Sequence, residues 1–224
     1  MKRTPLSARK LPDYTRGEEI TNMVTHILGG VLGIVALVLC PIAGARHHSA
    51  WAVVSGAIYG FSMLTLYTIS SIYHGLSPNL FGKKVLQVID HCTIYFLIAG
   101  SYMPVTLCTI RPYSPAWGWT LFGVVWALAA LAITLTAIDL KKYSKFSMIC
   151  YILMGWCIIV RIDLVYALLP RPGFWLLVGG GIAYTVGAVL YGLGKKRRFM
   201  HSAFHVFVVV GSLLQFFCIL LYVL

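Results

Sequence analysis

The sequence has few charged residues, and this scarcity excludes a soluble domain. Asp, Glu, Lys and Arg make up 11% of the 224 residues, and 59% of the residues are hydrophobic. Soluble domains carry about 25% charged residues. A helix needs about 20 mostly apolar residues to cross a bilayer, so this chain can cross several times with little left for loops. We therefore expect an integral membrane protein.

The sequence also lacks several motifs that point to particular classes of protein. The six cysteines lie in apolar stretches without a Cys-x-x-Cys pair, which indicates packing residues rather than disulfides or a metal cluster. No His-Glu-x-x-His motif occurs, so a zincin-type protease is excluded. The basic first 16 residues contain two prolines and no apolar run, and we expect no secretory signal peptide.

Seven apolar segments are long enough to span a bilayer. We expect helices at residues 20–44, 51–73, 85–109, 114–138, 146–168, 173–194 and 200–223. The connections are short, so consecutive helices should be antiparallel neighbours in one bundle. The expected fold class is an all-α integral membrane protein, a seven-transmembrane-helix bundle. A basic N-terminal segment (1–17) is expected to precede the membrane domain (18–224).

Basic residues are distributed unequally between the two sides of this bundle. Fourteen of the 18 Lys and Arg residues fall in the N-terminal segment and in the loops on its side of the membrane. Cytosolic loops carry such an excess, which predicts a cytosolic N-terminus and an external C-terminus. Juxtamembrane basic residues face anionic head groups, so the net charge of +12 indicates membrane lipids and no nucleic acid as partners. Protein partners are not predicted.

Polar side chains gather at the cytosolic end of the predicted bundle. Ser70 and His74 close the second helix, Asp90 lies in the first turns of the third, and His201 and His205 open the seventh. The topology comes from Lys and Arg alone, yet it brings these five residues to one end. Ionisable residues at membrane depth are costly and therefore indicate a functional site.

The spacing of these residues is compatible with a metal ion. His201 and His205 are four residues apart and share one helix face, so they can bind one cation together with His74. Three neutral imidazoles and a water are a usual ligand set for catalytic zinc. Asp90 could be a fourth ligand, orient another ligand, or take a proton from water, and Ser70 could donate to a bound oxygen. The alternative for the histidines is packing or hydrogen bonding between helices.

Other polar residues lie near this site. Glu19, Asn22 and His26 share roughly one face at the start of the first helix. They could form an outer shell of the site, or the acid could complement the helix N-terminus. His91 points about 100° away from Asp90 on the helix and is expected to hydrogen-bond to another helix.

The combined pattern resembles the progestin and adipoQ receptor superfamily. Ser-x-x-x-His closes the second helix, Asp lies early in the third, and His-x-x-x-His opens the seventh. The motif E-x-x-N-x-x-x-H-x-x-G from Glu19, the pair Asp90-His91 followed by G-S-Y-x-P from Gly100, and the glycines at 187 and 192 are similar to its bacterial hemolysin III branch. The resemblance covers residues 18–224.

The resemblance implies Zn2+ held by His74, His201 and His205, as in the related alkaline ceramidases. It also implies that Ser70 stabilises an oxyanion and that Asp90 activates a water. Hormone binding is not implied, because we expect no counterpart of the long soluble N-terminal segment of the eukaryotic receptors. The ceramide substrate is not implied either, since one sequence does not define the pocket that would select it.

Three functions follow as expectations. The first is a zinc-dependent hydrolase of an amide or ester bond in a membrane lipid, in the inner membrane of a bacterial cell. The alternative is a non-catalytic regulator or sensor of membrane lipid state with structural zinc. The cytolysin that the branch's name implies is the weakest mechanism, because we expect neither a secretion signal nor a form stable outside a bilayer.

Overall fold

Helices account for nearly the whole of the chain. The computed structural model describes residues 4–194 and 197–224. Within these two ranges, seven helical segments are long and apolar enough to cross a membrane, and no strand occurs. The structure thus confirms the expected all-α, seven-span bundle, whereas the side on which each terminus lies stays a prediction.

The seven spans correspond closely to the predicted segments. They comprise α1 (Arg16–Arg46), α2 (Ala50–Gly75), α3 (Phe81–Pro104) with η2 (Val105–Ile110) and α4 (Arg111–Tyr113), α5 (Pro115–Ile138), α6 (Ser144–Gly155) with η3 (Cys157–Arg161) and α7 (Ile162–Leu168), α8 (Arg171–Leu193), and α9 (Met200–Cys218) with η4 (Ile219–Val223). A short 3-10 turn, η1 (Leu6–Ala8), precedes α1.

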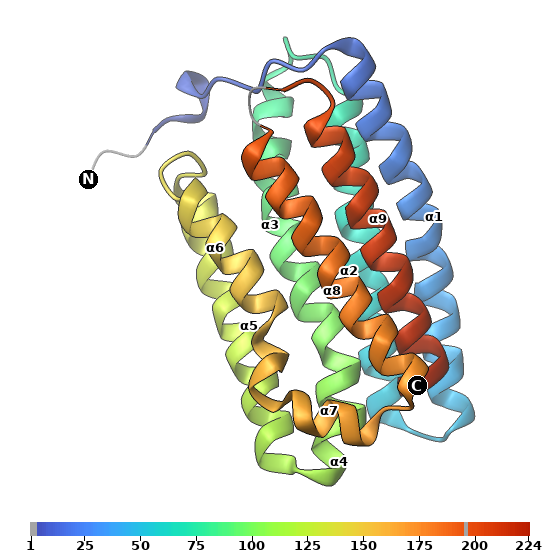
Figure 1. Cartoon of the computed structure of the whole chain (residues 1–224). Coiled ribbons are helices and arrows are strands. Elements are labelled where there is room, and N and C mark those ends of the chain that lie inside the picture. The colour runs from blue at the N-terminus through green and yellow to red at the C-terminus, as the bar shows by residue number, and fades with distance from the viewer. Residues whose placement is uncertain (1–3, 195–196) are drawn as a thin grey trace.

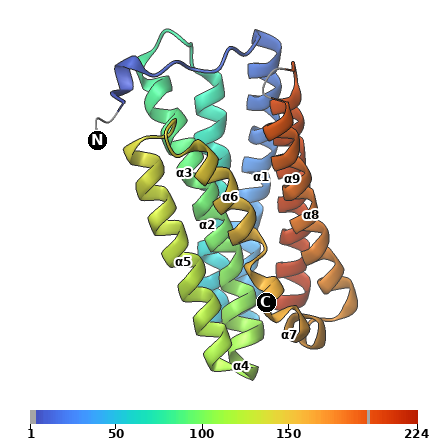
Figure 2. The same ribbon diagram turned by 60° about the vertical axis from the view of Figure 1, so that its left-hand side comes forward.

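The helices form one bundle with a common long axis (Figures 1 and 2). α1 packs against α2 and α9, α3 packs against α2 and α5, and α8 packs against α9. The starts of α1, α3 and α9 and the end of α2 lie at the same end of the bundle, uppermost in Figure 1. We call it the N-terminal end, and it is where the sequence analysis expects the functional site.

Close backbone contact joins α1 to α2. A Cβ added to Gly33 would lie 2.8 Å from the backbone of Leu64, and one added to Gly60 would lie 2.4 Å from the backbone of Leu37. Only glycine permits such an approach, which is how helices gain packing contacts in lipid. This contact fixes α1 beside the helix that carries His74.

The outer surface of the bundle is apolar. Along α1, Val24, Leu28 and Val31 are 46%, 63% and 56% exposed. Contiguous apolar surface of this kind is unfavourable in water and is the expected surface of a helix that faces lipid.

The fifth span departs from the prediction of one continuous helix over 146–168. α6 ends at Gly155 and is followed by the 3-10 turn η3. The hydroxyl of Tyr102 donates to the carbonyl of Gly155 at 2.9 Å and accepts from the backbone N–H of Ile158 at 3.0 Å. Backbone groups freed inside a membrane need such partners, so a side chain on α3 stabilises a break that the local sequence does not reveal.

Candidate metal centre

Three histidines from two helices meet at the N-terminal end of the bundle. His74 lies in the last turn of α2, and His201 and His205 lie one turn apart at the start of α9. One nitrogen of each ring lies within 4.8 Å of the others, and the Nε2 atoms of His201 and His205 are 3.0 Å apart. At this separation the two nitrogens can share one proton or one cation. The structure thus brings together the three candidate ligands, which we call the histidine cluster.

The histidine cluster fits a zinc ion in size and chemistry. Tetrahedral zinc with Zn–N bonds of about 2.0–2.1 Å holds its nitrogens about 3.3–3.4 Å apart, so small side-chain movements would close the rings around it. Nε2 of His74 is buried and has no hydrogen-bond partner. A buried polar atom without a partner is costly, and a cation held by the cluster would satisfy it.

The other nitrogen of His74 faces α1. Nδ1 lies 2.5 Å from Oε2 of Glu19 and 3.4 Å from Nδ2 of Asn22. The second carboxylate oxygen of Glu19, Oε1, accepts a hydrogen bond from Nζ of Lys83 at 2.7 Å. Glu19 and Asn22 therefore lie directly against a candidate ligand. From the sequence, Lys83 is expected only as one of the basic loop residues, and its place beside the site is not predicted.

Hydrogen bonds to the Glu18 carboxylate connect the start of α9 to the start of α1. Its Oε1 accepts from the backbone N–H of Phe199 at 2.7 Å, and its Oε2 accepts from Thr15 at 2.8 Å and from Arg198 at 3.3 Å. Phe199 has a φ of 59°, a left-handed conformation that is unfavourable for a bulky residue. Because Phe199 directly precedes α9, this carboxylate sets where the helix with two of the histidines begins.

The aromatic ring of Tyr14 covers the histidine cluster. It stacks on His201 with the ring centroids 4.9 Å apart and an interplanar angle of 8°, and its centroid lies 5.9 Å from that of His74. Burial raises the pKa of the Tyr14 phenol well above its usual value, so the hydroxyl stays protonated at neutral pH. The place of Tyr14 beside the site is not predicted from the sequence.

Residues 4–15, here called the N-terminal strap, run across the N-terminal end of the bundle (Figure 2). The backbone N–H of Thr4 donates to Oδ2 of Asp139 at 3.0 Å, and Nζ of Lys84 donates to the carbonyl of Ser7 at 2.8 Å. The bond from Thr4 lowers the pKa of Asp139 to about 2. The strap is therefore attached to residues outside α1, namely Lys84 on α3 and Asp139 after α5, and Tyr14 lies where the strap approaches α1.

Ser70 and Asp90 lie beside the histidine cluster. Both residues line the cavity that His201 and His205 also line, and both are buried, with 1% and 9% of their surface exposed. Among the described residues, the group of mutually close ligand atoms contains the three histidines and not Asp90. This position favours a role next to the ligands over a role as a fourth ligand.

Two further histidines line this cavity. His26 on α1 is 3% exposed, neither of its ring nitrogens has a partner, and its ring centroid lies 3.8 Å from that of His205. The expected hydrogen bond between His91 and another helix does not involve its Nδ1, which lies 2.8 Å from the carbonyl of Gln87 in its own helix. The backbone carbonyl of His91 makes the link instead and accepts from Tyr151 on α6 at 2.9 Å.

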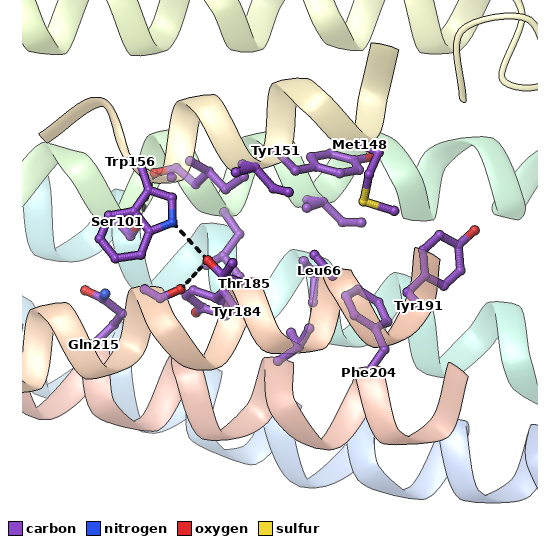
Figure 3. Close-up of a pocket in the computed structure, with 18 of the residues that line it drawn as sticks. Leu66, Ser101, Met148, Tyr151, Trp156, Tyr184, Thr185, Tyr191, Phe204 and Gln215 are labelled. Carbon is purple, nitrogen blue, oxygen red and sulfur yellow. Dashed lines mark hydrogen bonds between the residues drawn. The ribbon is translucent and has the colours of Figure 1, made fainter. Parts of the chain in front are cut away.

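An elongated cavity of about 160 Å³ lies beside the histidine cluster, bounded mainly by α3, α6, α8 and α9. Figure 3 shows Met148, Tyr191 and Phe204 at one end and Trp156, Thr185 and Gln215 at the other. Most of the lining is apolar. Phe204 lies between His201 and His205 in the sequence, so the histidines belong to the end with Phe204. A hydrocarbon chain with a polar group at that end would match this lining.

Comparisons with known proteins agree with this architecture over almost the full chain. The family model described as "Haemolysin-III related" matches residues 14–216. The chain is similar to "Hemolysin-3" of Bacillus cereus, with 43% identity over 92% of each chain. It is 42% identical to the "Hemolysin-3 homolog" of Bacillus subtilis, over 93% of this chain and 96% of that one. The human "Monocyte to macrophage differentiation factor" is 25% identical over 97% of this chain and 88% of its own.

Proposed function

This chain belongs to the haemolysin-III related family, and from its site we propose that it is a zinc-dependent hydrolase of an amide or ester bond in a membrane lipid. The observation that carries the proposal is the position of the histidine cluster. His201 and His205 form part of the wall of an apolar cavity, and a carboxylate and a hydroxyl belong to the same wall. This arrangement supports the proposal, because a candidate metal site, a candidate proton acceptor and a space that a hydrocarbon chain could occupy lie along one cavity.

The ligands of the proposed zinc are His74, His201 and His205. Zinc, when bound, supplies a Lewis acid that polarises a carbonyl and lowers the pKa of water toward about 7. Structural zinc has four protein ligands, whereas catalytic zinc keeps one position open. A cluster of three histidines with Asp90 outside it supports the catalytic arrangement over the structural one.

The remaining chemistry belongs to Asp90 and Ser70. Asp90 accepts a proton from the attacking water through a carboxylate oxygen and returns it to the leaving nitrogen or oxygen, as a general base and then a general acid. The hydroxyl of Ser70 donates a hydrogen bond to the oxygen of the scissile carbonyl. The C–N or C–O bond breaks, and the products are a carboxylic acid and an amine or alcohol.

The location proposed for this reaction is the cytosolic leaflet of the inner membrane of a bacterial cell. The excess of Lys and Arg at the N-terminal end supports a cytosolic N-terminus and an external C-terminus. The linkage between head group and acyl chain of a lipid lies near the interface, and the histidine cluster lies at helix ends that would reach this region. The basic segment of residues 1–17 would then face the cytosol beside the membrane domain of residues 18–224.

A lipid release assay tests the hydrolase. Zinc-loaded protein in vesicles that contain N-acyl and O-acyl lipids should release fatty acid, measured by mass spectrometry. Asp90→Asn should bind zinc as the wild type does and lose about 10²–10⁴-fold in rate, while Asp163→Asn, at the opposite end, should keep the wild-type rate.

Two results would contradict the hydrolase. If zinc-loaded protein releases no fatty acid from any of these lipids, the sensor with structural zinc would account for the site instead. Lysis of red cells by the purified protein without lipid hydrolysis would favour the activity that the names of the Bacillus relatives suggest.

A further inference from the structure

His74 differs from the other two members of the histidine cluster in what its second ring nitrogen contacts. Nδ1 of His201 and Nδ1 of His205 are buried and have no hydrogen-bond partner, whereas Nδ1 of His74 lies 2.5 Å from Oε2 of Glu19. Among the three candidate ligands, His74 is thus the one whose Nδ1 contacts a carboxylate. Its side chain is fully buried, and that of Glu19 is 15% exposed.

The contact with Glu19 determines which nitrogen of His74 carries the proton. A carboxylate only accepts hydrogen bonds, so Nδ1 must be the donor. Nδ2 of Asn22 also lies near Nδ1, but it is a donor too, and its distance of 3.4 Å is much longer than the 2.5 Å to Glu19. With the proton on Nδ1, Nε2 keeps its lone pair, and Nε2 is the buried nitrogen without a partner.

Lys83 holds Glu19 in this position. Its Nζ donates to Oε1 of Glu19 at 2.7 Å and to the carbonyl of Leu76 at 2.8 Å, and it lies 5.2 Å from the ring centroid of Tyr73. The side chain of Lys83 is 2% exposed. A buried ammonium is costly unless it is paired, and here its charged partner is the carboxylate that contacts His74. One oxygen of Glu19 is thereby directed to Lys83 and the other to the histidine.

We propose that Glu19 and Lys83 are positioning residues that act through His74 and set the affinity of the histidine cluster for its metal. The inference rests on the metal site of the proposed function. Glu19 fixes the tautomer and the orientation of the His74 ring, and Lys83 neutralises the carboxylate and keeps it from turning to the metal. Partners of this kind change metal affinity by about 10–100-fold.

The test measures zinc binding to the full-length protein in detergent by competition with a chelator. Glu19→Gln should weaken zinc binding by about 10–100-fold and change the visible absorption spectrum of the cobalt-substituted protein, because the ligand field of His74 changes. Lys83→Met should also weaken zinc binding and should lower the melting temperature, because it leaves the mostly buried carboxylate of Glu19 without its cationic partner. Lys145→Met is the control and should leave both properties unchanged, since Lys145 is exposed at the start of α6, a helix that carries none of the three histidines.

The double variant Glu19→Gln/Lys83→Met separates positioning from a purely structural role. Removal of both charges leaves no unpaired ion, so its melting temperature should recover relative to Lys83→Met. Its zinc affinity should stay as low as that of Glu19→Gln. Recovery of affinity together with stability would overturn the inference, and so would a Glu19→Gln variant that binds zinc within twofold of the wild type. If the wild type itself binds no metal, the metal site of the proposed function fails, and this inference fails with it.

Discussion

The two ends of the bundle carry charge in different ways. At the end opposite the strap, cations lie over aromatic rings. Arg111, Arg161 and Arg171 lie over Trp51, Trp117 and Tyr166 with centroid distances of 4.2, 4.8 and 3.6 Å. The acid at this end, Asp163, has a side chain that is 66% exposed and is paired with Arg161. At the N-terminal end, Glu18 and Lys83 are 3% and 1% exposed, and their bonds join different helices.

The difference indicates that charged residues at one end interact with the membrane surface, whereas those at the other end support the candidate site. Cations over interfacial aromatic rings need only a membrane surface, since both groups are favourable there. Buried charges that are paired across helices are costly to assemble, and they surround the histidine cluster. We therefore interpret the end with Asp163 as an anchor at the membrane surface and the N-terminal end as the location of the candidate site.

The largest difference between the two ends is expected in the loss of stability when an acidic residue is replaced by alanine. Glu18→Ala removes the Glu18 half of the capping box of α1, in which its side chain accepts from the backbone N–H of Thr15, and leaves the N–H of Phe199 without this acceptor. Together these losses should cost about 2–4 kcal/mol of unfolding free energy. Asp163→Ala removes a single exposed pair and should have no measurable effect. Unfolding of both variants in dodecyl sulfate, followed by circular dichroism, checks this. Equal losses for the two variants would contradict the distinction between the ends.

A smaller contrast is expected for two tyrosines. Tyr14→Ala removes the ring that is stacked on His201, so a water-soluble chelator should remove zinc several-fold faster than from the wild type. Tyr113, which is 69% exposed and lies at the opposite end, serves as the control, and Tyr113→Ala should not change the rate. Stopped-flow measurement with a coloured chelator gives both values. Identical rates for all three proteins would show that Tyr14 does not shield the histidine cluster.

The smallest effect concerns the attachment of the strap. The pKa of Asp139 in the folded protein is about 2, below its ordinary value of 3.8. The ionised carboxylate therefore stabilises the attachment of the strap fully above pH 4, and this stabilisation is lost as the pH falls toward 2. Pepsin should therefore cut the strap faster near pH 2 than near pH 4, relative to Asp139→Asn, in which this pH dependence is absent. The same pH dependence in both proteins would rule out Asp139 as the point of attachment.

Most of the fold follows from the sequence because lipid imposes strict requirements. A span needs a long apolar run, and all seven such runs became membrane-length helices. The break after Gly155 does not follow, because its cause is the hydroxyl of Tyr102, which is 53 residues away in the sequence. Local sequence does not contain the partners that long-range packing supplies.

The site could be predicted only in part, for a related reason. His74, His201 and His205 follow from topology, because the end of α2 and the start of α9 must lie at the same end of the bundle. Lys83 could have been found from its helical spacing, since residues 83, 87 and 90 share one face of α3 and all are buried. The position of Tyr14 depends on the path of an irregular segment, and no periodic pattern in the sequence predicts such a path.

The central claim is that the histidine cluster binds zinc, and metal content tests it most directly. Wild-type protein purified in detergent and supplied with zinc should contain about one zinc per chain by mass spectrometry, as expected for a single site. The variant His201→Ala/His205→Ala should contain almost none while keeping its helical circular dichroism. Absence of bound zinc from the wild type, or an equal amount in the folded double variant, would contradict the account.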